Sequence, residues 1–221
     1  MSALAFPRLT PWVGRLLVAN AVVLLVLWTV APGLFGWLAF SPATAVSRPW
    51  TFVTYMFVHA GLLHLAFNSL VLYFFGTAVE ERMGSRTFPL FYLLAGLGGA
   101  VFSLALSGLF AVPPFVGASG AVLGVSVAFA MYWPDAEVRI FPIPFPIRAR
   151  TLVLALIAFD AAMALAPRSD GVAHLAHLGG ALVGYVFLRL QGLPRGPDVR
   201  PAPRPVESGA FAARKAARAT A

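Results

Sequence analysis

Apolar runs of about 20 residues recur along this chain, and this feature constrains the fold more than any other. The 221 residues are 60% hydrophobic and only 11% charged, whereas an average soluble chain is about 25% charged. A soluble domain cannot bury so large an apolar fraction. A helix of about 20 apolar residues does cross the core of a bilayer. The sequence therefore predicts an all-α integral membrane protein.

The apolar runs predict six spans within one membrane domain, residues 1–191. The expected ranges are 12–31, 61–80, 87–109, 115–133, 149–167 and 171–190. The first run resembles a secretory signal peptide. However, the stretch from Trp12 to Phe40 is longer than the ~7–15 apolar residues of such a signal. We therefore interpret it as a retained span followed by an interfacial segment.

The basic residues predict the orientation of this domain. Six spans place both termini on one side of the membrane. Of the 16 lysine and arginine residues, only Arg48 and Arg168 then lie on the other side. Because basic loops stay in the cytoplasm, we expect an N-in, C-in protein of a bacterial inner membrane. Its partners would be the lipid bilayer and other transmembrane proteins, not nucleic acid, and the oligomeric state is left open.

Two segments differ in character from the spans. Residues 192–221 are rich in proline, alanine and arginine, which is typical of a disordered cytoplasmic tail. Residues 32–60 form a long connection that carries many aromatic side chains, and aromatic residues gather at the headgroup level. The connection is either an interfacial belt or an ordered loop that lies partly in the outer leaflet. Its aromatic residues are Phe35, Trp37, Phe40, Trp50, Phe52, Tyr55 and Phe57.

Polar side chains inside lipid are costly, so they are the first candidates for function. All four histidines of the chain fall near the outer face in this topology. His64, Asn68, Ser119 and His177 come from three spans, yet they share a depth of roughly 5–9 Å. Helix packing does not require this coincidence. The chain has no cysteine, so a serine activated by a histidine is the simplest nucleophile available.

The spacing within the spans suggests how these side chains could meet. His64 and Asn68 lie four residues apart on one helix face, where they could stabilise a developing negative charge or form interhelical hydrogen bonds. Small residues follow both Ser119 and His177, and such faces let helices approach closely in lipid. The two small faces are Gly120 with Gly124 and Gly180 with Gly184. Their packing would bring Ser119 and His177 together.

Three other interpretations stay open. The histidines could hold zinc, although the chain has no HExxH motif and no cysteine ligand. Asp160, deep in the fifth predicted span, could orient a catalytic histidine, but we favour a structural or gating hydrogen bond. A transporter could use the histidines as a proton relay, but the spans turn apolar toward the cytoplasm. We expect no metal and no cofactor.

Several motifs in order resemble the rhomboid family of intramembrane serine proteases. His59, His64 and Asn68 form an H-x4-H-x3-N motif, GASG surrounds Ser119, and AHxGGxxxG runs from Ala176 to Gly184. The segment VEERMGSRTF at 79–88 is similar to the family's junction between its second and third spans. The resemblance covers roughly residues 45–190.

This resemblance implies a six-transmembrane-helix rhomboid-like bundle with a partly immersed first loop. It also implies a serine endopeptidase that cleaves in or near transmembrane segments, with Ser119 as nucleophile and His177 as general base in a dyad without an acid. The oxyanion hole would comprise His64, Asn68 and the Ser119 backbone N–H. Structural support would come from His59, Gly117, Gly120 and Gly180. The alternative is a non-catalytic rhomboid-like protein that binds membrane clients.

Two positions depart from the family pattern. Where members often have Trp-Arg before the first histidine, this chain has Trp50 and Thr51, with Arg48 upstream. Some members stack a tyrosine on the catalytic histidine, and the corresponding residue here is Leu123. We therefore expect apolar packing to hold the ring of His177.

Overall fold

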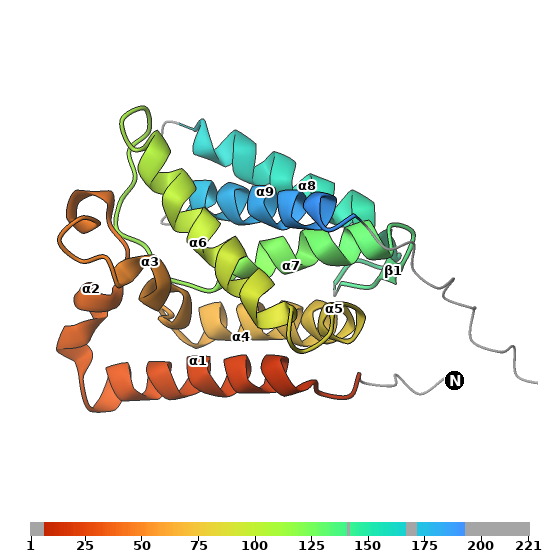
Figure 1. Cartoon of the computed structure of the whole chain (residues 1–221), viewed down its shortest axis with the longest axis horizontal. Helices are drawn as coiled ribbons and strands as arrows, with labels where there is room; N and C mark the ends of the chain where they lie inside the picture. The colour runs from red at the N-terminus through yellow and green to blue at the C-terminus, as the bar shows by residue number, and fades with distance from the viewer. Residues whose placement is uncertain (1–6, 141, 167–171, 193–221) are drawn as a thin grey trace, which may run out of the picture.

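The computed structural model describes residues 7–140, 142–166 and 172–192. Within these ranges the chain is a helical bundle with a single pair of short strands (Figure 1). Of the predicted tail, residues 192–221, all but the first residue lie outside the described ranges. The long helices are α1 (Pro11–Thr29), α4 (Leu62–Val71) continued by the π-helical segment η4 (Leu72–Gly76) and α5 (Thr77–Met83), α6 (Phe88–Leu106), α7 (Ser119–Tyr132), α8 (Ala149–Ala164) and α9 (His174–Leu190).

Helix α9 occupies the middle of the bundle. It packs against α6, α7 and α8, whereas α1 lies at the edge beside α4 and α5 (Figure 1). One buried apolar cluster joins the side chains of α1, α5, α6, α7 and α9. Helix α8 is the most exposed of the group around α9, with only three buried residues among sixteen. The core of the bundle is therefore formed mainly by α6, α7 and α9.

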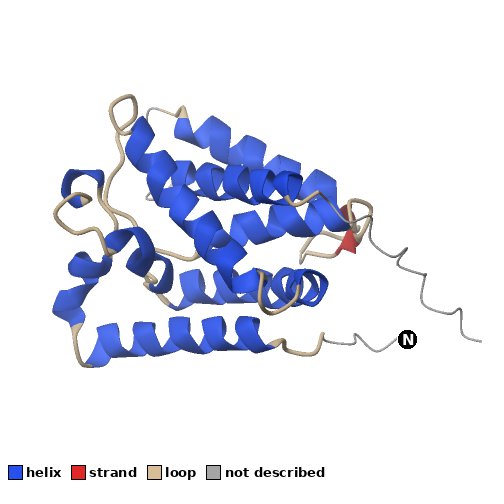
Figure 2. Ribbon diagram, in the orientation of Figure 1, coloured by secondary structure: helices blue, strands red, loops and turns tan. Residues whose placement is uncertain are grey.

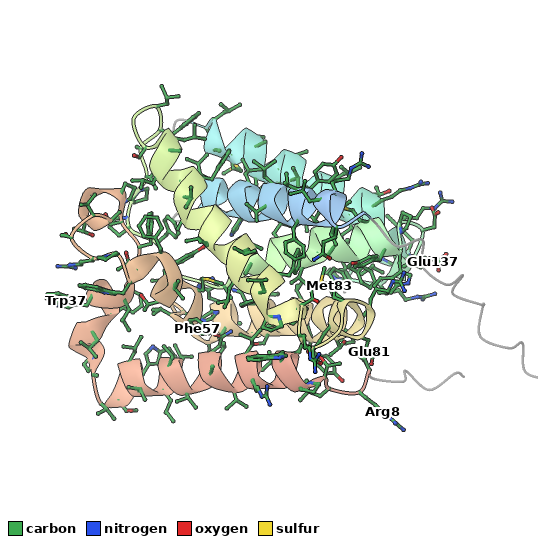
Figure 3. The ribbon with its side chains drawn as sticks, viewed as in Figure 1. Arg8, Trp37, Phe57, Glu81, Met83 and Glu137 are labelled. Atoms are coloured by element: carbon green, nitrogen blue, oxygen red, sulfur yellow. The ribbon has the colours of Figure 1, made fainter. Side chains whose placement is uncertain are left out.

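The long helices run between two distinct ends of the molecule. The strands β1 (Glu137–Val138) and β2 (Ile147–Arg148) and the start of α1 lie at one end (Figure 2). The side chains of Arg8 and Glu81 lie at this end too, and that of Trp37 lies at the other (Figure 3). Successive long helices thus alternate in direction, as the predicted topology requires.

Three of the described helices are long and apolar enough to cross a bilayer. They are α1, the continuous stretch Leu62–Met83 and α6. Helices α7 and α9 are apolar but have only 14 and 17 residues. The count of six membrane crossings, and their orientation, therefore remain predictions.

The span predicted at 115–133 is wrong at its start, because the helix begins four residues later, at Ser119. Phe115 is extended instead. It exchanges two backbone hydrogen bonds with Phe40, at 3.0 and 2.9 Å. Gly117 has a φ of 128°, which lies outside the helical region, so the helix cannot begin before this residue. The other span boundaries shift too: α6 ends at Leu106, three residues before the predicted end.

The connection between α1 and α4 is ordered, as one of the two interpretations of residues 32–60 predicted. It contains the short helices α2 (Phe35–Leu38) and α3 (Thr51–Thr54) and the 3₁₀ turns η1 (Pro32–Leu34), η2 (Pro42–Thr44) and η3 (Tyr55–Phe57). The indole N–H of Trp50 donates to the carbonyl of Trp37 at 2.9 Å. The Arg48 guanidinium lies 4.1 Å from the centre of the Trp37 ring. Arg48, which lies upstream of Trp50, thus contacts the part of this loop that contains α2.

Glu80 connects α5 to the first turn of α1. Its buried carboxylate accepts hydrogen bonds from the backbone N–H groups of Trp12 and Val13 at 3.0–3.1 Å. The Ser85 hydroxyl donates to the same carboxylate at 2.7 Å. The first N–H groups of a helix have no partner within the helix, and Thr10 makes no side-chain cap. Glu80 therefore caps α1 from another helix and places a negative charge at the positive end of its dipole.

We expect Glu80→Gln to destabilise the folded protein by about 1.5–3 kcal/mol, because a buried charged acceptor of several hydrogen bonds is lost. The change should appear as a lower unfolding temperature in a mild detergent. Glu81→Gln is the matched control, since Glu81 is the exposed neighbour. Equal unfolding temperatures for the two variants would contradict the capping role.

Candidate active site

Ser119 is the first residue of α7, and its position follows from the backbone just before it. Gly117 has a φ of 128°, which residues with a side chain rarely adopt. The Gly117 N–H donates to the carbonyl of Tyr55 at 2.9 Å, which ties the approach segment to the first loop. Ser119 thus lies at a helix N-terminus, where backbone N–H groups point outward without intrahelical partners.

His177 lies in the first turn of α9, and its ring faces Ser119. The distance between His177 Nε2 and Ser119 Oγ is 2.6 Å, although the residues are 58 positions apart. His177 Nδ1 lies 2.9 Å from Asp160 Oδ1. An ionised carboxylate has no proton to donate, so Nδ1–H is the donor of that pair. In the neutral ring Nε2 is then the acceptor, and the Ser119 hydroxyl donates to it.

The predicted glycine faces of α7 and α9 do pack together. A Cβ atom on Gly180 would overlap the carbonyl oxygen of Gly120, and one on Gly184 would lie 2.9 Å from Gly124 Cα. A Cβ on Gly120 would lie only 2.8 Å from the carbonyl oxygen of Ala176. The absence of side chains therefore sets the separation of the two helices next to the Ser119–His177 pair.

Helix α6 contributes a third glycine face, which is not among the predicted packing faces. A Cβ on Gly99 would lie 2.7 Å from the carbonyl oxygen of Ala176. Gly98 also packs on α9, where a Cβ would overlap the side chain of Val183 and lie 3.1 Å from the carbonyl oxygen of Gly179. The phenol of Tyr55 donates to the carbonyl of Gly96 at 2.8 Å. The run GLGG at residues 96–99 indicates that another helix approaches α6 closely, but no sequence motif shows that this helix is α9.

His64 projects from α4 toward the same place. A methyl group on Gly117 would lie 2.6 Å from His64 Nε2 and 3.6 Å from Ser119 Oγ, so both atoms flank Gly117. The Ala60 N–H donates to His64 Nδ1 at 3.4 Å. Because Nδ1 accepts, the proton of the neutral ring is on Nε2, the atom beside Gly117. His64 is thus oriented as a hydrogen-bond donor toward the space next to Ser119.

Asn68 and His59 flank His64. The Asn68 amide donates one N–H to the backbone carbonyl of His64 at 2.9 Å, and the residue borders the same cavity as Ser119. His59 is 1% exposed, and its ring packs edge-on against His64 with ring centres 5.1 Å apart. Burial, together with the charge of His64, lowers the pKa of His59 to about 4. His59 is therefore neutral at pH 7 and contacts His64 rather than Ser119.

One cavity of about 820 Å³ brings the predicted residues together. Side chains from α4, α7, α8 and α9 border it, as do residues of the first loop. Ser41, Thr44 and Arg48 supply polar groups from that loop. The predicted residues that line it are His64, Asn68, Ser119 and His177, joined by Asp160.

Asp160 is a residue of α8 whose carboxylate contacts two histidines of α9. It is 6% exposed, and its Oδ1 lies 2.6 Å from His174 Nδ1 as well as 2.9 Å from His177 Nδ1. From the sequence we favour a structural or gating hydrogen bond for Asp160 and expect apolar packing to hold the His177 ring. That packing expectation was incomplete, because a carboxylate contacts the ring directly.

Asp160, His174 and His177 are also the one group in the described ranges that could hold a metal ion, with ligand atoms within 4.8 Å of one another. Zinc lies ~2.0–2.1 Å from its nitrogen and oxygen ligands, which keeps tetrahedral donor atoms roughly 3.3 Å apart. The two observed separations, 2.6 and 2.9 Å, are those of hydrogen bonds. The three side chains would have to move apart to bind zinc.

Comparison with known proteins identifies the family of this chain. Residues 46–192 match the Rhomboid domain family. The chain belongs to the rhomboid family. It is therefore a multi-pass integral membrane protein, and the site lies within the matched residues.

Three curated relatives illustrate the similarity. Rhomboid protein 1, mitochondrial, from Saccharomyces cerevisiae is 36% identical over 59% of this chain and 38% of its own length. The rhomboid protease GluP of Bacillus subtilis is 32% identical over 66% of this chain and 27% of its own length. The rhomboid protease AarA of Providencia stuartii is 31% identical over 62% of this chain and 54% of its own length. The matched region thus spans between about a quarter and a half of these relatives.

Proposed function

We propose that this protein is an intramembrane serine endopeptidase that cleaves peptide bonds in or near the transmembrane segments of other proteins. The observation that carries the proposal is the 2.6 Å contact between Ser119 Oγ and His177 Nε2. Both residues border a cavity that also contains His64 and Asn68. The family includes GluP and AarA, which are named as proteases.

The geometry supports the following steps. Ser119 Oγ attacks the scissile carbonyl carbon while its proton passes to His177 Nε2. The tetrahedral intermediate collapses as the C–N bond breaks, and His177 returns the proton to the leaving amine. Water then attacks the acyl-enzyme with His177 again as the base. This releases the second product and restores the Ser119 hydroxyl.

The negative charge on the tetrahedral intermediate would be stabilised by donors already in place. The backbone N–H of Ser119 lies at the positive end of α7, which favours an anion. The His64 Nε2–H beside Gly117 and the amide of Asn68 are the side-chain donors. Losing one such donor typically costs about 10²–10³-fold in rate, so His64 and Asn68 are proposed as oxyanion donors, with His59, Gly117, Gly120 and Gly180 as their support.

The surroundings of the site suggest its substrates and its place in the membrane. The cavity combines apolar walls, such as Phe67 and Val71 of α4, with polar groups from the first loop. An apolar peptide and the attacking water could therefore share it. We propose six membrane crossings with both termini in the cytoplasm, because 14 of the 16 basic residues then lie inside. We also propose a bacterial inner membrane as the location. The site then faces the extracytoplasmic side.

A fluorophosphonate probe tests the proposal on the whole chain in detergent. We expect one labelled peptide, containing Ser119, and loss of labelling when His177 is replaced by alanine. Mass mapping of the products from a panel of single-span membrane proteins should then place the cleavage sites in or near their spans. A folded protein that takes no label and cleaves none of the panel would instead be a non-catalytic, client-binding member of the family.

A further inference from the structure

The carboxylate of Asp160 is the feature that the Ser–His pair leaves unexplained. It comes from α8, whereas both of its histidine partners come from α9. His174 and His177 are three residues apart on one face of that helix, so both Nδ1 atoms reach the same oxygen, at 2.6 and 2.9 Å. Asp160, His177 and Ser119 thereby form a continuous chain of hydrogen bonds.

The burial of this carboxylate needs a physical reason. An ionised carboxylate taken out of water costs several kcal/mol unless it is paired and hydrogen-bonded. Asp160 is 6% exposed and His174 is 7% exposed. The two imidazole N–H groups supply the needed donors. A buried polar network is stabilising only when its members are satisfied, so the two histidines and the aspartate depend on one another.

The position of Asp160 along α8 gives the contact a second consequence. The three buried residues of α8 are Ala149, Val153 and Asp160, and the first two lie near the start of the helix. Asp160 is therefore the only fully buried side chain in the last eleven residues of α8. Its hydrogen bonds to α9 connect this part of the helix to His177.

Resting on the proposed function, we propose that Asp160 is a positioning residue for His177. Its carboxylate accepts the Nδ1–H of His177 and so keeps Nε2 unprotonated and aimed at Ser119. When the Ser119 proton moves to Nε2, the carboxylate stabilises the imidazolium that forms and itself stays ionised. The second donor, His174, fixes the rotation of the carboxylate. Catalysis thus uses an acid on α8, and displacing α8 from α9 would remove it.

The test compares the whole parent chain with Asp160→Asn, Asp160→Glu and the control Leu154→Ala, all in detergent. Leu154 is on α8, 64% exposed and away from the cavity. An asparagine can present its N–H₂ to Nδ1 and favour the wrong tautomer of His177. We therefore expect Asp160→Asn to lower both kcat and the rate of fluorophosphonate labelling about tenfold or more. KM should change less than about threefold, because asparagine has nearly the size of aspartate and the hydrogen bonds of Asp160 go to His174 and His177.

Glutamate should recover part of the loss, since it restores a carboxylate, and Leu154→Ala should match the parent. Asp160→Asn that folds and keeps kcat and labelling within about twofold of the parent would overturn the proposal. A loss confined to KM would do the same, because it would indicate a role in substrate entry alone.

Nitrogen-15 NMR of the histidine rings gives a readout that needs no turnover. The chain has only four histidines, and His177 is assigned by its loss in His177→Ala. In the parent we expect the His177 proton on Nδ1, and in Asp160→Asn a shift of that proton to Nε2. If the asparagine variant does not fold, the parent spectrum decides, and a proton on Nε2 there would refute the proposal. Absence of Ser119 labelling in a parent with the expected spectrum would count against the protease function alone.

Discussion

Ser119→Ala is expected to lower the turnover of a transmembrane substrate by about 10⁴- to 10⁶-fold, the range seen when a serine protease loses its nucleophile. The physical reason is that no other group can form the acyl bond. The chain has no cysteine, and Ser119 is the hydroxyl that contacts His177 Nε2. Cleavage of a labelled substrate in liposomes, followed as single-turnover rates, measures the loss.

Ser107→Ala is the matched control for this prediction. Ser107 directly follows α6 and donates to the carbonyl of Leu104 at 2.8 Å, and it does not border the cavity. Its variant should cleave at the parent rate. The Ser119 variant should also keep the parent's unfolding temperature and still crosslink to the substrate, because only one oxygen atom is removed. Cleavage by Ser119→Ala at the parent rate would eliminate Ser119 as the nucleophile.

Gly180→Ala is expected to lower activity by about 10²-fold or more without touching a catalytic atom. The added methyl group would overlap the carbonyl oxygen of Gly120, so α7 and α9 must move apart. The Ser119–His177 hydrogen bond, now 2.6 Å, is lost when the atoms separate by a further ångström. Overpacking of this kind also costs about 1–3 kcal/mol in stability.

Kinetics and thermal unfolding of the same preparation separate these two effects. Gly108→Ala is the matched control, because a Cβ there meets nothing within 4 Å. We expect the Gly108 variant to match the parent in both measurements. A Gly180 variant with parental activity and parental unfolding temperature would show that α7 and α9 are not held at the separation described.

The close packing of α7 on α9 was predictable, because small residues four apart favour close approach in lipid whatever the rest of the fold. Gly120 and Gly124 do face Gly180 and Gly184. The equally close packing of α6 on α9 was not predicted. A glycine-rich run indicates that another helix packs closely against its own helix. Which helix this is depends on the loops that connect the helices and on how all the helices pack together.

The start of α7 was mispredicted because hydrophobicity does not distinguish a helix from an extended apolar segment. Phe115 and Val116 continue the apolar run, yet Phe115 pairs with Phe40 and the helix begins only at Ser119. Two prolines and a glycine before Ser119 were the local signals of this boundary. The difference matters, since it places Ser119 at a helix N-terminus instead of one turn inside the helix.

The sequence by itself determined that this protein lies in a lipid bilayer and which side chains are available for chemistry. Its apolar content requires a bilayer. Its lack of cysteine makes a serine activated by a histidine the simplest nucleophile, and the order of the motifs along the chain identifies the rhomboid family. Only the tertiary structure decided which of these groups meet. Ser119 and His177 are 58 residues apart and Asp160 is on a third helix, so their contacts depend on how the helices pack. A hydrogen bond requires an accuracy of tenths of an ångström, and residue spacing along a chain does not contain that information.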